Sequence, residues 1–195
     1  MTDLPSQAAA AGNDAEPRLA RLEIFVDGSN FYTMLRGSYL QDKIDIPRFA
    51  RELARTGPQY VLVKLNYYTA PSPVDETRRR QDRFFEELRL SSTVRLVLGR
   101  HERRGEVNVE KETDVNLAVD MVVGAYEDRY DVAMLVTGDT DQVRAVTAVR
   151  DLGKPVIWGH FAPQQHSDHL RQVCSEAFLF SEHFMRKCIR PAPGR

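Results

Sequence analysis

Short apolar runs alternate with longer amphipathic stretches along most of the chain, and this alternation limits the possible fold more than any other feature. The runs have the length of buried strands and lie at residues 22–26, 60–68, 94–98, 132–136 and 156–158. Strands that alternate with helices build a parallel sheet with crossover helices. We therefore expect an α/β fold with a central, mostly parallel sheet of about five strands flanked by helices.

Helix start and stop signals separate these runs. Asp45 with Pro47 starts a helix through residue 55, Thr113 or Asp114 caps another, and Gly153 ends a third. The expected helices cover residues 45–55, 73–90, 113–127 and 141–151. A short helix after residue 167, a further strand at 177–180 and a closing helix complete the prediction.

The length of 195 residues fits one domain, for which we expect residues 18–190. Residues 1–17 are rich in Ala, Pro, Asp and Gln without apolar periodicity and are expected to be a disordered leader, with a loose tail at 191–195. The two cysteines favour a reducing compartment. No run approaches the roughly 18 apolar residues of a membrane span. These features predict a soluble cytoplasmic protein with no membrane partner.

The net charge of −1 excludes a broadly basic nucleic-acid binder, yet it hides two opposite blocks. Residues 78–104 contain nine arginines and four acids, a net charge of +5. Residues 105–141 contain ten acids and two bases, a net charge of −8. The sequence therefore favours a local charged site over a generally charged surface.

Acidic residues follow two of the expected strands and open one helix. Asp27 ends the first strand, Asp139 and Asp141 follow the fourth, and Asp114 begins the helix before it. Parallel sheets carry their sites at the carboxyl ends of the strands, so these side chains are expected to converge. Close carboxylates repel by roughly 4 kcal/mol per pair at an effective dielectric of 20. Protons or a hard cation such as Mg²⁺ or Mn²⁺ would relieve this repulsion. For any single aspartate, a helix cap or turn role is the alternative.

Three stretches together resemble one family: IFVDGSNFY (24–32), KETDVNLAVDM (111–121) and YDVAMLVTGDTD (130–141), followed by LGK at 152–154. They closely resemble the NYN-domain branch of the PIN-like nucleases, especially its bacterial LabA-like group. The resemblance covers about residues 21–180 in consistent order.

The resemblance implies a Rossmann-like PIN fold whose acidic cluster binds Mg²⁺ or Mn²⁺ and hydrolyses RNA. The positions that match the family's site are Asp27, Asn30, Asp114, Asp120, Thr137, Asp139 and Asp141, with Lys111 shortly before Asp114. Asp114 and Asp120 lie roughly 120° apart on an ideal helix, so both cannot point at one ion. We expect Asp114 to be the ligand and Asp120 to support it or to pair helices.

The basic block supplies candidate RNA contacts. Arg78, Arg79 and Arg83 lie on an expected helix, and Arg100, Arg103 and Arg104 lie in an expected loop before residues 107–109. These arginines and Lys111 are candidates for phosphate contacts. A solvated helix face that pairs with neighbouring acids explains the helix arginines equally well. Phe31, Tyr32, Tyr67 and Tyr68 flank strand ends, where core packing is the simpler role and base stacking the alternative.

Together these features predict a metal-dependent ribonuclease, an endonuclease with one or two ions at Asp27, Asp114, Asp139 and Asp141. Two alternatives stay open: a non-catalytic RNA-binding adaptor that keeps the fold, and a phosphoesterase that acts on DNA. PIN-like domains often pair, so a homodimer is one expected assembly. No heptad pattern or obvious apolar stripe in the sequence assigns its interface.

Overall fold

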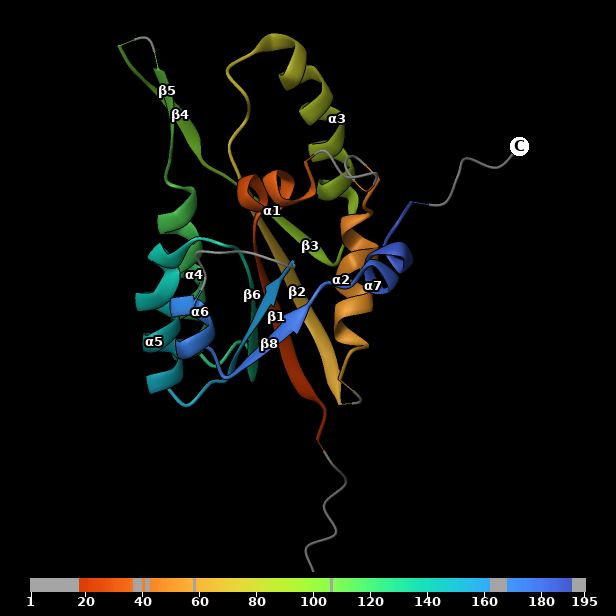
Figure 1. The fold of residues 1–195 in the computed structure, drawn as a ribbon, viewed down its shortest axis with the longest axis vertical. Helices are drawn as coiled ribbons and strands as arrows, with labels where there is room; N and C mark the ends of the chain where they lie inside the picture. The colour runs from red at the N-terminus through yellow and green to blue at the C-terminus, as the bar shows by residue number, and fades with distance from the viewer. Residues whose placement is uncertain are drawn as a thin grey trace, which may run out of the picture.

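The computed structural model describes residues 18–36, 40, 43–57, 59–105, 107–161 and 168–190, so the expected leader and tail lie outside it. Six strands form one sheet in the order β3-β2-β1-β6-β7-β8, and every neighbouring pair is parallel (Figure 1). The strands are β1 (Ala20–Asp27), β2 (Tyr60–Thr69), β3 (Val94–Leu98), β6 (Val132–Val136), β7 (Val156–His160) and β8 (Glu176–Leu179). The predicted parallel α/β fold is confirmed, and the further strand expected at 177–180 is β8, the sixth strand of the sheet.

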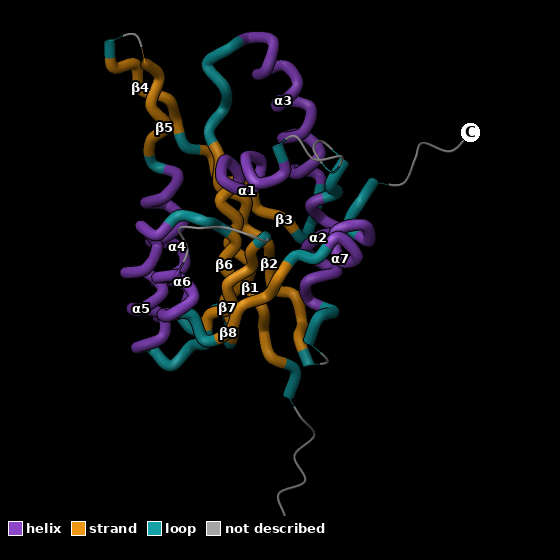
Figure 2. Tube along the Cα trace, viewed as in Figure 1, coloured by secondary structure: helices purple, strands orange, loops and turns teal. Residues whose placement is uncertain are grey.

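Helices cover both faces of the sheet and enclose two cores (Figures 1 and 2). The first face carries α1 (Gly28–Leu35), α2 (Ile46–Ala54), α3 (Asp75–Leu90) and α7 (Glu182–Lys187). The second face carries α4 (Thr113–Tyr126), α5 (Val143–Asp151) and α6 (Asp168–Val173), with the short 3₁₀ turn η1 (Thr140–Gln142) before α5. The buried runs predicted from the sequence lie between these two layers.

Residues 100–111 differ from the expectation. In place of a loop, they form an antiparallel hairpin of β4 (Arg100–Arg104) and β5 (Val107–Lys111) that projects beside α1 and α3 (Figure 1). Gly105 makes the turn at a φ of 62°. The first strand of the hairpin, RHERR, contains no apolar residue, so it lacks the alternation by which a half-buried strand is recognised.

Two further sequence predictions, at the starts of α1 and α4, were wrong. The sequence showed no helix over α1, which begins directly at the end of β1. At α4, neither Thr113 nor Asp114 is the cap, because Glu112 occupies the N-cap position in a left-handed conformation with a φ of 76°. The first turn of α4 therefore follows the hairpin without a capping side chain.

The solvent face of α4 is apolar. Val115, Val119, Val123 and Tyr126 follow one another at helical spacing and are 64%, 52%, 38% and 79% exposed. The expectation that the chain has no apolar stripe is therefore wrong. The sequence concealed it because α4 is apolar on its core face too, and both faces merge into one apolar run.

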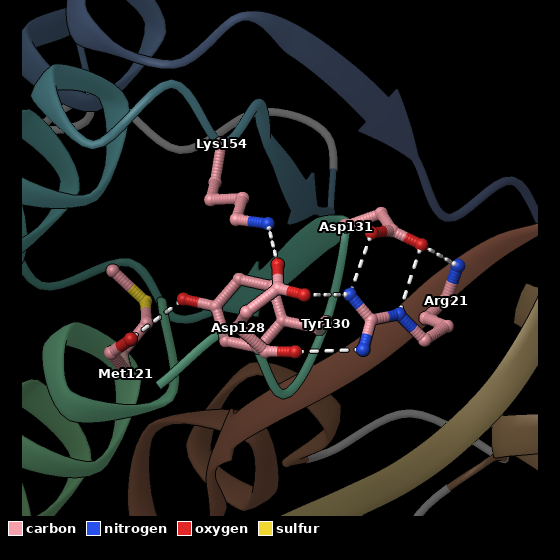
Figure 3. A network of polar contacts seen from close by, with 6 residues as sticks. All are labelled: Arg21, Met121, Asp128, Tyr130, Asp131 and Lys154. Carbon is pink, nitrogen blue, oxygen red and sulfur yellow. Dashed lines mark hydrogen bonds and ion pairs between the residues drawn. The ribbon is translucent and has the colours of Figure 1, made fainter. Parts of the chain in front are cut away.

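A charged network ties the opposite end of the sheet together (Figure 3). Arg21 on β1 binds both carboxylate oxygens of Asp131 at 2.8 and 3.1 Å, and it also binds the Asp128 side chain at 2.8 Å. Lys154 forms a second ion pair with Asp128. The Arg21 guanidinium holds the pKa of Asp131 well below its usual range. The network thus joins the start of β1 to the turn before β6 and to the loop before β7.

None of the helices in the described part of the chain combines the length and apolar character that a membrane span needs.

We predict that Arg21→Ala lowers the urea midpoint of unfolding at pH 7, because two aspartates lose their shared cation. Arg55→Ala is the control, since Arg55 makes only an exposed pair with Glu52 three residues away. The folded-state pKa of Asp131 is depressed, so its contribution is present above the ordinary value of 3.8 and is lost as pH falls below it. The gap between wild type and Arg21→Ala should therefore narrow below about pH 4; a gap that stays constant contradicts the prediction.

Candidate active site

Asp27 stands where β1 ends and α1 begins. Its Oδ1 accepts a hydrogen bond from the Asn30 backbone N at 2.9 Å, and its Oδ2 accepts one from Thr137 Oγ1 at 3.0 Å. The residue is 7% exposed. A Cβ at Gly28 would lie 2.7 Å from the Tyr68 backbone oxygen, so only glycine lets the chain turn into α1 this close to β2. Asp27 is therefore a buried carboxylate that also caps a helix.

The loop after β6 joins the same point. Asn30 Oδ1 accepts from the Gly138 backbone N at 2.8 Å, and Thr137 Oγ1 accepts from the Asp139 backbone N at 3.1 Å. Asp139 Oδ1 in turn accepts from the Asp141 backbone N at 2.9 Å. Asn30 and Thr137 thus hold the β1 and β6 loops against each other, and Asp139 and Asp141 follow directly.

Glu110 is a fifth acid that the sequence reasoning missed. It is the second-last residue of β5, and its carboxylate accepts hydrogen bonds from Ser29 Oγ at 2.8 Å and from Thr113 Oγ1 at 2.7 Å. These bonds tie β5 to the first turns of α1 and α4. Glu110 directly precedes the KETDVNLAVDM motif, which begins at Lys111. This position could identify it as a site residue only once the hairpin was known.

The five carboxylates Asp27, Glu110, Asp114, Asp139 and Asp141 form one electrostatic cluster. Burial raises the pKa of Asp27 to about 6, with Asp114 and Glu110 adding to the shift and hydrogen bonds from Asn30 and Thr137 opposing it. Burial also raises the pKa of Asp114, followed by repulsion from Asp139, Glu110 and Asp141. Within the described ranges, no Lys or Arg forms an ion pair with any of the five. The cluster therefore has the unbalanced negative charge that a divalent cation relieves.

The side chains do not form a complete ligand shell by themselves. Among the described residues, no group of three or more His, Cys, Asp or Glu side chains is arranged to hold a metal ion. Mg²⁺ commonly binds through one or two carboxylates, keeps several waters and takes substrate phosphate oxygens. The donor atoms and charge thus fit a hard cation that shares its shell with water or phosphate.

Comparison with known proteins now adds the family. The model of the NYN domain matches residues 21–182. The chain belongs to the NYN domain family. This family is in general one of PIN-like nucleases, and the matched range contains all five acids of the cluster.

Solved structures support the fold of this NYN domain. A protein of unknown function, VPA0982 from Vibrio parahaemolyticus RIMD 2210633, is 18% identical, with a TM-score of 0.65 over 86% of this chain and 97% of its own. A Listeria monocytogenes protein that carries the name of a UDP-N-acetylglucosamine 2-epimerase is 7% identical, with a TM-score of 0.40 over 88% of this chain and 42% of its own. The first likeness shows the fold alone, and the second carries no argument. No curated protein matches the chain significantly.

Asp120 of the NYN domain is engaged elsewhere. Its Oδ2 accepts from the Tyr68 hydroxyl at 3.0 Å and pairs with Arg95 at 3.1 Å. Burial and the nearby Asp120 carboxylate raise the pKa of Tyr68 above its ordinary range. The side chain of Asp120 on α4 therefore contacts Tyr68 of β2 and Arg95 of β3. This agrees with its angular separation from Asp114.

The candidate RNA-contacting residues of the NYN domain fall into different settings. Arg83 lines a cavity of about 740 Å³, together with Arg80, whereas Arg78 and Arg79 are not among its lining residues. Arg100 pairs with Glu112, and Arg103 Nε donates to the Gly105 carbonyl. Lys111 closes the hairpin opposite Arg100, and the side chain of Arg104 lies outside the described part of the chain. Arg83 is thus the one of these candidates that lines the cavity.

We predict that Asp27→Asn stabilises the metal-free NYN domain at neutral pH. The folded-state pKa of about 6 exceeds the ordinary 3.8, so the contribution of Asp27 to stability is full below pH 3.8 and is lost as pH rises through 6. Asparagine cannot ionise and keeps an oxygen for the Asn30 backbone. Urea unfolding in EDTA should show the variant more stable by about 2 kcal/mol at pH 8 and no more stable at pH 3.5.

The matched control is Asp82→Asn, which removes an exposed carboxylate from the middle of α3. It should leave stability nearly unchanged at both pH values. Equal stability of wild type and Asp27→Asn at pH 8 would show that burial of the Asp27 charge costs nothing.

Proposed function

We propose that this NYN domain is a metal-dependent ribonuclease, an endonuclease of the LabA-like kind that hydrolyses RNA phosphodiester bonds with Mg²⁺ or Mn²⁺. The observation that carries the proposal is Asp27. It is a buried carboxylate with a pKa of about 6, electrostatically coupled to further acids and not balanced by any described cationic side chain. A family of PIN-like nucleases supplies the reaction class.

In this proposal Asp27, Asp114, Asp139 and Asp141 hold the ion. A bound divalent ion lowers the pKa of a coordinated water and stabilises charge that develops on the phosphate. Thr137 fixes one Asp27 oxygen by its hydrogen bond, and Asn30 fixes the β6 loop through Gly138. These two residues therefore keep the ligand-bearing loops in register while the substrate binds.

Glu110 and Asp120 act through other groups. Glu110 orients Ser29 and Thr113 at the starts of α1 and α4, and it adds negative charge beside Asp27 and Asp114. Asp120 positions α4 through Tyr68 and Arg95. Both are positioning residues in this proposal.

RNA is the proposed partner, and the basic residues of α3 and the hairpin are its proposed phosphate contacts. They are Arg78, Arg79, Arg83, Arg100, Arg103, Arg104 and Lys111. Arginine forks suit phosphate oxygens, and a negative cluster needs nearby cations to draw in a polyanion. A cytoplasmic location and a homodimer stay predictions, and the apolar face of α4 has the character that an interface between copies needs.

One observation favours a second candidate function, an RNA-binding adaptor that does not cleave. As placed, the described side chains include no ready group of three metal ligands. A domain that never completes its ion shell would bind RNA without turnover.

We predict that purified protein cuts a labelled single-stranded RNA in Mn²⁺ or Mg²⁺ and not in EDTA. Asp27→Asn and Asp114→Asn should each slow cleavage at least about 100-fold, because each removes charge that holds the ion. Asp27→Asn is predicted to be the more stable protein, so its loss of activity cannot be attributed to unfolding. The measurement is product formation on a denaturing gel, where internal fragments identify an endonuclease.

Asp82→Asn is again the control and should cleave at the wild-type rate. Asp120→Asn should slow cleavage less than Asp114→Asn, because Asp120 acts through α4. Binding of RNA without cleavage in either metal would overturn the proposal in favour of the adaptor.

A further inference from the structure

The cavity of about 740 Å³ is a groove enclosed by three elements at the acid end of the sheet. Tyr32 of α1, Arg83 and Phe84 of α3, and His101 and Glu110 of the hairpin all line it. These elements meet at one end of the molecule in Figure 1, with α1 between the hairpin and α3. A groove of this size accepts a drug-sized molecule, which for a polynucleotide means about one or two nucleotides.

The groove leads into the acidic cluster. Glu110 lines the groove and also repels the Asp27 and Asp114 carboxylates. Ser29, which donates to Glu110, and Gly28, which follows Asp27, line it as well. A chain lying in the groove would therefore lie beside Glu110 and beside Gly28 and Ser29, the two residues that follow Asp27.

Aromatic side chains form its walls. Tyr67 and Phe84 meet edge to face with their ring centroids 5.6 Å apart, and Tyr67 is 5% exposed. Tyr32 lines the groove and is 47% exposed, so its ring presents a large surface. An exposed aromatic face beside a groove is the arrangement on which unpaired bases stack.

One arginine of the walls is suited to bind phosphate. Arg80 is paired with Glu76 and Arg190 with Glu87. Arg83 also lines the groove, and across the described residues it takes part in no ion pair. The Arg83 guanidinium has no described carboxylate partner and lies in the same groove as the aromatic wall. It can therefore bind the phosphate next to a base that stacks on this wall.

We propose that this groove binds single-stranded RNA, with an unpaired base against Tyr32 and an adjacent phosphate at Arg83, and so selects unpaired segments for the acidic cluster. The proposal rests on the proposed ribonuclease function for its substrate. Bases in a duplex are paired and stacked on their neighbours, so they cannot lie against Tyr32. The groove thereby determines which part of an RNA reaches Asp27.

Binding is tested apart from cleavage, by fluorescence anisotropy of a labelled 12-nucleotide single strand in EDTA. Tyr32→Leu should weaken binding roughly tenfold, while Tyr32→Phe keeps the ring and should bind as wild type does. Arg83→Gln should weaken binding several-fold and reduce the slope of log affinity against log salt by about 0.7, the value for one lost contact to a single strand. A blunt-ended duplex of the same length should bind more weakly than the single strand, because none of its bases is free to lie against Tyr32.

Two matched control variants carry the same substitutions at positions outside the groove. Tyr126→Leu removes a tyrosine of α4 that is 79% exposed, and Arg89→Gln removes another exposed arginine of α3; neither residue lines the groove. Both should bind as wild type does. Wild-type binding by Tyr32→Leu and Arg83→Gln, or equal binding of single strand and duplex, overturns the groove proposal even if cleavage occurs. Groove-dependent binding without cleavage in any metal supports the groove and removes the proposed function alone.

Discussion

One buried carboxylate organises the acid end of this molecule. Asp27 accepts from the Asn30 backbone and from Thr137, so a single side chain caps α1 and joins β1 to the loop after β6. The Gly138 backbone N also donates a hydrogen bond to Asn30 Oδ1. Together these bonds fix the start of the loop that carries Asp139 and Asp141. Because Asp27 is 7% exposed and its pKa is raised to about 6, this organisation has a cost in charge burial. The same cost makes the position receptive to a cation.

The aspartates at the two ends of β1 have opposite electrostatic environments. At its start, Arg21 lowers the pKa of Asp131, and Lys154 followed by Arg21 lowers that of Asp128, so those carboxylates add to stability at neutral pH. At its end, no described cation pairs with Asp27, and neighbouring acids raise its pKa further. Residue type alone therefore does not distinguish a structural from a functional aspartate; its partner does. This asymmetry is the physical argument for placing function at the carboxyl end of the sheet.

The sequence predicted the elements whose apolar residues follow a regular pattern, and it missed two elements that lack one. The parallel sheet and its two helical layers were predicted because buried runs have a readable period. The hairpin was missed because its first strand, RHERR, contains no apolar residue, and α1 because its Asp-Gly-Ser-Asn start reads as a turn. The acids at strand ends followed from topology, and the divergence of Asp120 followed from helix geometry, whereas Glu110 could not be found without the hairpin that carries it. The arginines of α3 could not be sorted either, because which face of the helix lines a groove depends on tertiary packing.

The hairpin also explains why opposite charge blocks adjoin in the sequence. The basic block ends at Arg104 and the acidic block begins at Gly105, the residue that makes the turn with a φ of 62°. The turn pairs the end of the basic block with the start of the acidic block as antiparallel strands, so His101 lies opposite Glu110. The basic strand β4 lies beside β5, which carries Glu110, so cationic groups lie within a few residues of the carboxylate cluster and form no described ion pair with it. A net charge near zero is therefore compatible with a local site that attracts a polyanion and also binds a cation.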